Sequence, residues 1–241
     1  MSAPGRRRFT TFVRRLRERF GPLDPPRRTD PLAELILTVL SQHTSDRNAE
    51  RAFTELRSTF PSWEDVASAS APQVARAIRS GGLGNTKAPR IQAILREIHR
   101  REGRYDLGVL HRRPDDDVRS YLASLPGVGP KTAAVVMAFS LRRPALPVDT
   151  HVHRVTRRLG LVPDASSAER AHRVLDEIVP DDLKIPLHVG WIRLGREICK
   201  PGRPRCEVCP LIDLCPTAPV VLGRPVRRRA RTSTRGKDPS G

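Results

Sequence analysis

Aromatic residues are scarce in this chain of 241 residues: they make up 4% of it, while hydrophobic residues as a whole make up 38%. The core must therefore be filled mainly by Ala, Val, Leu and Ile. The sequence also lacks any apolar run near the ~18 residues that a membrane-spanning helix needs. The basic segment 1–19 contains no apolar stretch of signal-peptide length. We therefore expect a protein that is neither embedded in a membrane nor secreted.

Lysine is also rare. The chain has 44 basic residues and a net charge of +18, yet only five of the 44 are lysine: Lys87, Lys131, Lys184, Lys200 and Lys237. Arginine keeps its proton, whereas a lysine in a suitable environment loses it and becomes a nucleophile. Each lysine is therefore a candidate catalytic residue and not simply a source of positive charge.

The positive charge is concentrated near the two ends of the chain. Residues 1–28 carry +7 and residues 218–241 carry +6, which leaves +5 for the long middle section. Basic ends of this kind commonly contact a polyanion, and nucleic acid is the first candidate. The alternative is a pair of solubilising, disordered tails.

Apolar residues recur at helical spacing over most of the chain. Signals of helix ends accompany them, with Ser62 and Asp65 at a start and Gly81-Gly82 at a stop. No apolar–polar alternation of strand length occurs, so we predict an all-α protein. The later helices are expected to begin near Asp116 and to span 131–140, 150–159, 167–179 and 186–198, and the tail 218–241 is expected to be disordered.

A glycine- and proline-rich hairpin, over residues 125–133, separates two of these helices. Gly127 and Gly129 are expected to adopt backbone angles closed to other residues and to let another backbone approach closely. Pro130 suits the first position of a helix, where its missing N–H costs nothing. Such a turn aims free backbone N–H groups at a phosphate and would grip DNA without reading its bases. The alternative is an ordinary connection between two helices.

Residues 125–131 resemble the helix-hairpin-helix of the endonuclease III group of DNA glycosylases. A second segment, 148–154, reads V-D-T-H-V-H-R and is similar to the aspartate motif of that group, with Asp149 18 residues after Lys131. The resemblance covers roughly residues 30–216. It implies that Lys131 attacks C1′ of the deoxyribose and displaces a damaged base, and that the resulting imine allows β-elimination and a nick 3′ of the lesion.

The chemistry of the two residues agrees with these implied roles. Lys131 falls in the first turn of an expected helix, where the macrodipole and partial burial favour the nucleophilic amine over the ammonium ion. Asp149 could accept a proton, orient the amine and stabilise positive charge on the sugar. Each residue also has a simpler interpretation, because Lys131 could contact a phosphate and Asp149 could cap the helix that follows it.

All four cysteines lie within 17 residues, as Cys199, Cys206, Cys209 and Cys215. Disulfides are not expected in a chain without a signal peptide. Four thiolates suit either a structural zinc ion or a [4Fe–4S] cluster, and the spacing alone leaves both open. The resemblance implies the cluster, because the C-x6-C-x2-C-x5-C spacing is that of the group's iron–sulfur loop.

Basic residues in the same loop are candidate contacts to DNA phosphates, since the resemblance implies that this loop lies near the DNA backbone. They are Lys200, Arg203 and Arg205. The alternative for each is a solvated surface side chain.

Two further loops resemble the segments with which the group enters DNA. Leu83, in the stretch 82–87, corresponds to a leucine that wedges between bases, although a leucine buried at a helix turn would look the same in sequence. Residues 40–46 read L-S-Q-H-T-S-D and resemble the group's L-S-A-Q-x-T-D, whose glutamine fills the gap left by the extruded base. Here that glutamine falls on His43, while Gln42 stands one place earlier, so both are candidates.

Two departures from the group's pattern lie beside Lys131. Ala134 stands where the best-known members carry asparagine, and we expect this to alter lesion preference. Pro130 replaces a frequent arginine, which removes one DNA contact without harming the hairpin.

These features predict an all-α, two-domain helix-hairpin-helix DNA glycosylase fold with a [4Fe–4S] cluster loop. The resemblance implies a helical domain over 24–143 and a cluster domain over 144–217, with which the basic segment 1–23 packs, while 218–241 forms the tail. We expect a monomeric, cytoplasmic, nucleoid-associated enzyme of prokaryotic type. Its partner would be double-stranded DNA that contains damaged bases or abasic sites.

The function that we predict is that of a bifunctional DNA glycosylase/AP lyase of base excision repair acting on oxidised pyrimidines. One alternative is a monofunctional glycosylase, although the adenine-mispair relatives lack a lysine at the position of Lys131. The other is a non-catalytic DNA-binding or iron–sulfur redox protein, which would need neither an amine nucleophile nor a carboxylate beside phosphates.

Overall fold

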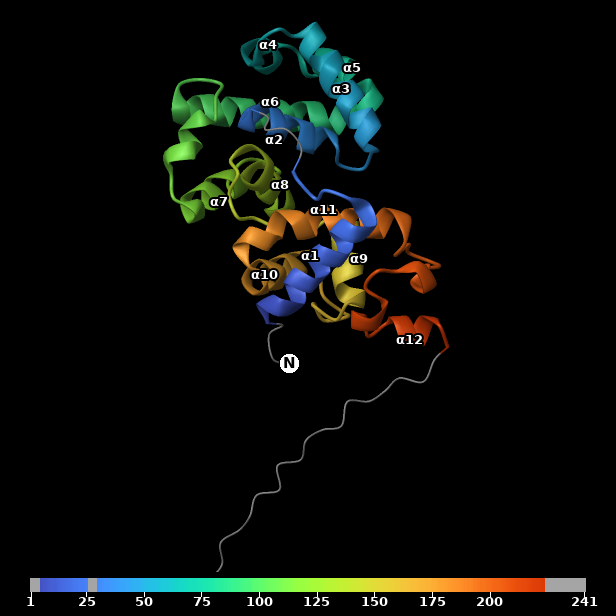
Figure 1. Ribbon diagram of the computed structural model, residues 1–241. Coiled ribbons are helices and arrows are strands. Elements are labelled where there is room, and N and C mark those ends of the chain that lie inside the picture. Colours follow the sequence, from blue (N-terminus) through green and yellow to red (C-terminus); the bar gives the residue numbers. More distant parts are fainter. Residues whose placement is uncertain (1–4, 26–29, 224–241) are drawn as a thin grey trace, which may run out of the picture.

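The computed structural model of the protein describes residues 5–25 and 30–223, which contain helices, turns and loops but no β-strand (Figure 1). The expectation of an all-α protein is therefore confirmed. No helix in these residues is both long and apolar enough to cross a bilayer. The α-helices are α1 (Arg6–Phe20), α2 (Pro31–Leu40), α3 (Asp46–Thr59), α4 (Trp63–Ser68), α5 (Ala71–Ala77), α6 (Gly84–Glu102), α7 (Asp115–Ala123), α8 (Pro130–Val135), α9 (Thr150–Arg158), α10 (Ala168–Ile178), α11 (Asp181–Glu197) and α12 (Ala218–Val221).

Several helix ends follow from the local sequence. The Ser62 hydroxyl accepts a hydrogen bond from the Asp65 N–H at 3.0 Å, and the Asp65 carboxylate accepts one from the Ser62 N–H at 2.9 Å. This capping box begins α4 as predicted. The helices predicted near 116, over 150–159 and over 167–179 are found as α7, α9 and α10, and their observed ends lie within one residue of the predicted ones.

Two predicted helices differ from the structure. The one predicted over 131–140 divides into α8 and a wider π-helical turn, η3 (Val136–Ser140), which is fully buried. The one predicted from Pro186 begins five residues earlier, as α11, with the proline inside it. Proline removes one N–H from the helical ladder. The burial of Leu187 and Trp191 on the same helix offsets that loss.

The buried side chains form two hydrophobic cores. The first, from Leu32 to Ala145, is built by α2 to α8 and η3, and we call this part the helical lobe. The second draws on residues 9–23 and 146–211, and we call it the cysteine lobe. Figure 1 shows α1 lying beside α11 within the cysteine lobe. Segments from both ends of the chain therefore build one core.

Helix α1 excludes the alternative of a disordered basic tail at the N-terminus. Phe9, Phe12 and Leu16 on one of its faces are fully buried. On another face, Arg6 forms an ion pair with Asp182 at 2.6 Å. Because the apolar residues recur at helical spacing, the basic segment has a buried stripe that holds it on the protein.

The predicted C-terminal tail is described only in part. Residues 218–221 form the short helix α12, where disorder was expected, and Ala218 is buried. Residues 224–241, which carry the basic charge of this tail, lie outside the described residues.

Charged side chains join the two lobes. Arg196 on α11 binds Asp46 at the start of α3 at 2.6 Å, and Arg119 on α7 binds Asp176 on α10 at 3.0 Å. The buried Lys184 binds the same Asp176 carboxylate at 3.0 Å. An exposed pair contributes little to stability, but a partly buried network with shared partners positions the helices that carry it. The pair of Arg119 with Asp176 holds α10 against the helical lobe, next to α8.

Candidate active site and nucleic-acid interface

The hairpin between α7 and α8 needs glycine at one of its two glycine positions. Gly127 has φ +71°, and a Cβ there would lie 2.7 Å from Cδ of Arg90, so a larger residue would be both strained and in collision. Gly129 has φ −90° and ψ 177°, an extended conformation open to any residue, with free space around it. The expectation of special backbone angles is therefore wrong for Gly129, because the turn reverses at Gly127 alone. Both glycines are exposed, so their backbone is accessible.

Lys131 lies half-buried in the first turn of α8 and lines a cavity of about 320 Å³ where the two lobes meet. The helical lobe contributes Gln42 and hairpin residues to the wall, and the cysteine lobe contributes Val148 and part of α10, including His172. This volume is at the lower end of the range for small-molecule sites. The cavity therefore has room for a group the size of one base beside the lysine.

Asp149 is the N-cap of α9, so the simpler of its two predicted roles is present in the structure. Its Oδ1 accepts a hydrogen bond from the Val152 N–H at 2.7 Å. A carboxylate has two oxygens and about four lone-pair sites, so the cap leaves acceptor capacity for chemistry. Val148, the preceding residue, lines the cavity that holds Lys131. The lysine and the carboxylate thus come to this junction from different lobes.

A buried histidine outside the predicted motifs interacts with both of these charges. His188 on α11 is 5% exposed, and its Nδ1 lies 2.8 Å from the carbonyl oxygen of Pro147. Burial lowers the pKa of His188, and the charges of Asp149 and Lys131 act on it in opposite directions. A neutral imidazole therefore lies within electrostatic range of the amine and the carboxylate. No local motif marks it, since it is separated from both by dozens of residues.

The two predicted DNA-entering loops share an unusual backbone conformation. His43 has φ 55° and Leu83 has φ 54°, and residues with a β-carbon seldom adopt this left-handed region. Both side chains are exposed, and Leu83 exposes 56% of its surface although it is apolar. The alternative of a buried leucine is therefore wrong. Strained, exposed positions of this kind are common where a loop is shaped for a partner.

Two basic side chains of α6 connect these loops to each other and to the hairpin. Lys87, which is 2% exposed, donates from Nζ to the carbonyl oxygens of Leu40 at 2.7 Å and Gly81 at 2.8 Å. Arg90, one turn later, donates from Nη1 to Oε1 of Gln42 at 2.9 Å and packs against the hairpin glycine. Burial lowers the pKa of Lys87, and its two carbonyl partners satisfy the buried ammonium. Helix α6 therefore fixes the relative positions of the hairpin and both loops.

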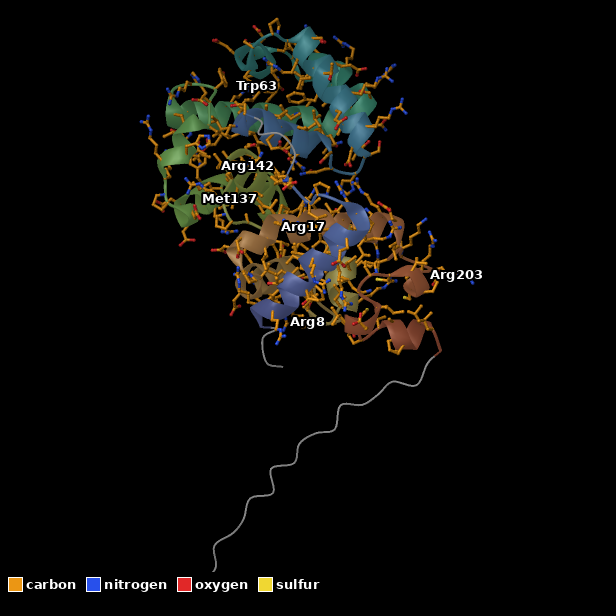
Figure 2. The ribbon with its side chains drawn as sticks, in the orientation of Figure 1. Arg8, Arg17, Trp63, Met137, Arg142 and Arg203 are labelled. Carbon is orange, nitrogen blue, oxygen red and sulfur yellow. The ribbon has the colours of Figure 1, made fainter. Side chains whose placement is uncertain are left out.

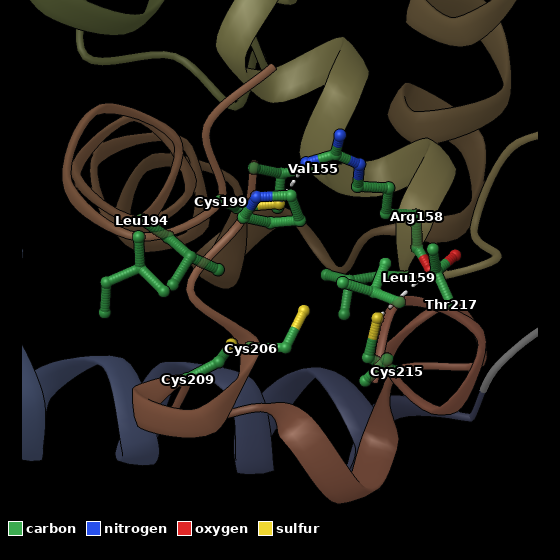
Figure 3. Close-up of a pocket in the computed structure, with 13 residues that line it drawn as sticks. Val155, Arg158, Leu159, Leu194, Cys199, Cys206, Cys209, Cys215 and Thr217 are labelled. Carbon is green, nitrogen blue, oxygen red and sulfur yellow. Dashed lines mark hydrogen bonds between the residues drawn. The ribbon is translucent and has the colours of Figure 1, made fainter. Parts of the chain in front are cut away.

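The four cysteines line one enclosed, largely apolar space between α9, α11 and the C-terminal loop (Figure 3). Arg158 donates from Nη1 to Sγ of Cys199 at 3.3 Å, and the Cys215 Sγ–H donates to the carbonyl oxygen of Arg158 at 3.2 Å. No two of the four are joined in a disulfide. The thiols thus face a common, largely apolar space, and Arg158 places a cation beside one sulfur.

The four thiols together supply the donor set of a metal site. A zinc ion bound at about 2.3 Å holds its four sulfurs about 3.8 Å apart. No three of the Cys, His, Asp and Glu side chains in residues 5–25 and 30–223 converge closely enough to hold one metal ion. An iron–sulfur cube keeps its cysteine ligands farther apart than a single ion does, and four thiols around one space are the donor set that it uses.

The basic residues of the cysteine loop are all exposed. Lys200, Arg203 and Arg205 have no buried side chain among them, and Figure 2 shows Arg203 projecting from the edge of the cysteine lobe. Arg158 fixes the backbone of their loop, because its guanidinium donates hydrogen bonds to the carbonyl oxygens of Lys200 and Pro201 at 2.7 Å each. The loop therefore has a fixed backbone and free basic side chains.

Known proteins are similar to this chain in sequence. Over 187 residues, 78% of the chain, it is 38% identical to endonuclease III of Thermotoga maritima, of which 83% is covered. It is 33% identical to endonuclease III of Bacillus subtilis over 187 residues, which cover 78% of this chain and 81% of that protein. A relative from Arabidopsis thaliana is 36% identical over 187 residues, which span 64% of its own length.

Solved structures agree with the fold. A trapped endonuclease III–DNA covalent intermediate aligns with a TM-score of 0.77 at 29% identity, over 91% of this chain and 99% of that one. A helix-hairpin-helix DNA glycosylase fold, as predicted, is thus confirmed. Residues 36–181 match the HhH-GPD superfamily, described as base excision DNA repair proteins. This chain, with its hairpin, lysine and aspartate inside the matched region, therefore belongs to the HhH-GPD superfamily of base excision DNA repair proteins.

Proposed function

We propose that the protein is a bifunctional DNA glycosylase and AP lyase that removes oxidised pyrimidines from duplex DNA and nicks abasic sites. The observation that carries this proposal is that Lys131 lines the cavity between the lobes, while Asp149 follows Val148 of the other lobe's lining and acts on the same buried His188 as Lys131 does. DNA binding alone needs no amine nucleophile in a cavity. Excision of a base by an amine needs one, together with an acceptor for the proton that the amine releases.

In the proposed reaction the Lys131 amine attacks C1′ of the target nucleotide. The N–C1′ bond forms, the glycosidic bond breaks, and the base leaves with its bonding electrons. Asp149 accepts the proton lost by the attacking nitrogen and stabilises positive charge on the sugar. The C1′–O4′ bond then breaks, with O4′ taking a proton, and the sugar opens to an imine. The imine makes a C2′ proton acidic, and loss of that proton expels the 3′ phosphate by β-elimination.

We propose that the enzyme reaches the lesion with the hairpin and the two loops that α6 holds in place. The exposed hairpin backbone would bind phosphate, and Leu83 would wedge between stacked bases from its strained loop. His43, rather than Gln42, is the proposed gap filler because it is the exposed member of the pair. Lys200, Arg203 and Arg205 would add salt-dependent phosphate contacts.

We further propose that Cys199, Cys206, Cys209 and Cys215 hold a [4Fe–4S] cluster. The cluster, when bound, supplies a covalent tie across the cysteine loop, and with it a fixed position for the loop's basic side chains. We propose that the enzyme acts as a monomer with domains at 24–143 and 144–217, the latter packed with 1–23. A chromosomal substrate would associate it with the nucleoid in the cytoplasm.

Borohydride trapping on duplex DNA with a single abasic site tests the lyase. The reductant converts the imine into a stable amine, so the native protein should give a covalent adduct and Lys131→Gln should give none. Lys200→Gln is the matched control: it removes an exposed lysine that does not line the cavity, and at saturating protein, where one lost phosphate contact no longer limits binding, it should still be trapped. If the native protein gives no adduct but still releases a base, the protein is monofunctional; if it does neither, the enzymatic proposal fails.

A further inference from the structure

The wall of the cavity beside Lys131 includes polar groups from both lobes that the proposed chemistry does not use. Gln42 lies on this wall from the loop after α2, and Glu169 and His172 lie on it from α10. A base rotated out of the helix and attacked at C1′ must lie near the attacking amine, so it must meet this wall. The polar groups there can distinguish one base from another.

Arg90 fixes the orientation of the Gln42 amide. Its guanidinium donates to Oε1 of Gln42 at 2.9 Å, and a guanidinium has no acceptor, so the amide oxygen must face it. The side chain of Arg90 also lies against Gly127, so close that a Cβ on that residue would come within 2.7 Å of it. The NH2 end of the amide is therefore directed away from Arg90 and remains available to donate.

His172 adds a second group that lacks a partner. It is 5% exposed, and its Nε2 makes no hydrogen bond within the part of the chain that the structure describes. Burial lowers the pKa of His172, so the imidazole is neutral at pH 7. A buried polar atom without a partner is costly to the protein alone. A ligand in the cavity that bonds to it would recover that cost.

We propose that Gln42, oriented by Arg90, is the specificity-determining residue for the extruded base, and that its NH2 group donates to a carbonyl oxygen of that base. This inference rests on the proposed glycosylase function. It also separates the two neighbouring loop residues, with Gln42 facing the extruded base and His43 facing the DNA. The chemical class of base selected is one with a carbonyl oxygen, rather than an amino group, at the contacted position.

The test compares base release with the lyase step, because an abasic site has no base to read. Gln42→Glu keeps the size of the side chain and an oxygen for Arg90, but it replaces the NH2 donor with an acceptor. Single-turnover base release from 5-hydroxyuracil and 5-hydroxycytosine duplexes is measured beside nicking of the same duplex with an abasic site. These two bases share the C2 carbonyl and differ at C4, as carbonyl or amino, and at the adjacent N3, which carries a hydrogen only in 5-hydroxyuracil. Gln73→Glu, an exposed glutamine on α5, is the control for the added negative charge.

The ratio of base release to nicking should fall about 10- to 100-fold in Gln42→Glu and stay constant in Gln73→Glu. A fall confined to 5-hydroxyuracil assigns the contact to the C4 carbonyl, and an equal fall for both bases assigns it to C2. An unchanged ratio in Gln42→Glu overturns the inference and leaves the proposed function standing. A native protein that neither releases bases nor nicks DNA overturns both.

Discussion

The two lobes are stabilised in different ways around their DNA-facing parts. In the helical lobe the candidate contacts sit on strained loops: His43 and Leu83 both have positive φ, and the buried Lys87 ties their loops through backbone carbonyls. In the cysteine lobe the described residues include no non-glycine with positive φ. Its loop is held by the guanidinium of Arg158 and by the four cysteines.

This difference separates two tasks. A loop that enters DNA needs an exposed apolar tip in a fixed conformation, and strain is tolerated there because a buried ammonium anchors the loop. A loop that follows the DNA backbone needs only a fixed main chain and exposed basic side chains. In the proposed reaction neither lobe suffices alone, since Lys131 belongs to one and Asp149 to the other. The proposed catalytic geometry therefore depends on how the lobes meet, through contacts such as that of Arg119 with Asp176.

The largest expected effect separates the structural role of Asp149 from its chemical one. Asparagine caps a helix about as well as aspartate, so Asp149→Asn should leave the melting temperature nearly unchanged. It should lower single-turnover base release about 10²- to 10⁴-fold, because the proton acceptor is lost. The control is Ser62→Ala, which removes the cap of α4 and should cost about 1 kcal/mol in stability while activity is kept. Unchanged base release in Asp149→Asn would leave the residue a cap alone.

In the cysteine lobe, the loss of one thiol should mainly lower the stability of the protein. Cys206→Ser should lose the broad visible absorbance of a cluster and lower the free energy of unfolding by about 3 kcal/mol, or roughly 6–12 °C in melting temperature. Val208→Ala changes an exposed residue of the same loop and should alter neither property. A colourless native protein that contains zinc would contradict the proposed cluster.

In the helical lobe, a change at an exposed loop tip should lower enzymatic activity without lowering stability. Leu83→Ala removes an exposed apolar tip, so base release should fall about 10-fold, because less unstacking energy is supplied, while the melting temperature holds. The matched control is Val221→Ala, an exposed apolar residue on α12 that is 42% accessible. A lower melting temperature with normal base release would show that Leu83 packs in solution and does not enter DNA.

The smallest expected effect concerns the loop of the cysteine lobe. Arg203→Gln should weaken DNA binding equally for all sequences and reduce the slope of log affinity against log salt by about 1. Arg100→Gln removes a cation that is paired with Glu97 on α6 and should leave the slope unchanged. Equal slopes for native protein and Arg203→Gln would remove this arginine from the interface.

Predictions that depend on neighbouring residues agree with the structure. The capping box of Ser62 and Asp65, the turn at Gly127 and the helix after Asp149 each depend on a few consecutive residues. Predictions fail where distant packing overrides a local signal. Pro186 suggests a helix start, yet α11 begins five residues before it because its apolar face is buried.

The sequence by itself determined the all-α class, the hairpin, the paired lysine and aspartate, and the set of four cysteines. These features depend on the spacing of residues along the chain, because that spacing sets the local backbone geometry and the number of side chains that could bind a metal. Only the tertiary structure decided that Gln42 lines the cavity, because its partner Arg90 is 48 residues away. It likewise decided that His188 and His172 are buried beside the chemistry, and that the basic N-terminus forms part of a core. Contacts between residues far apart in sequence exist only once the helices have packed.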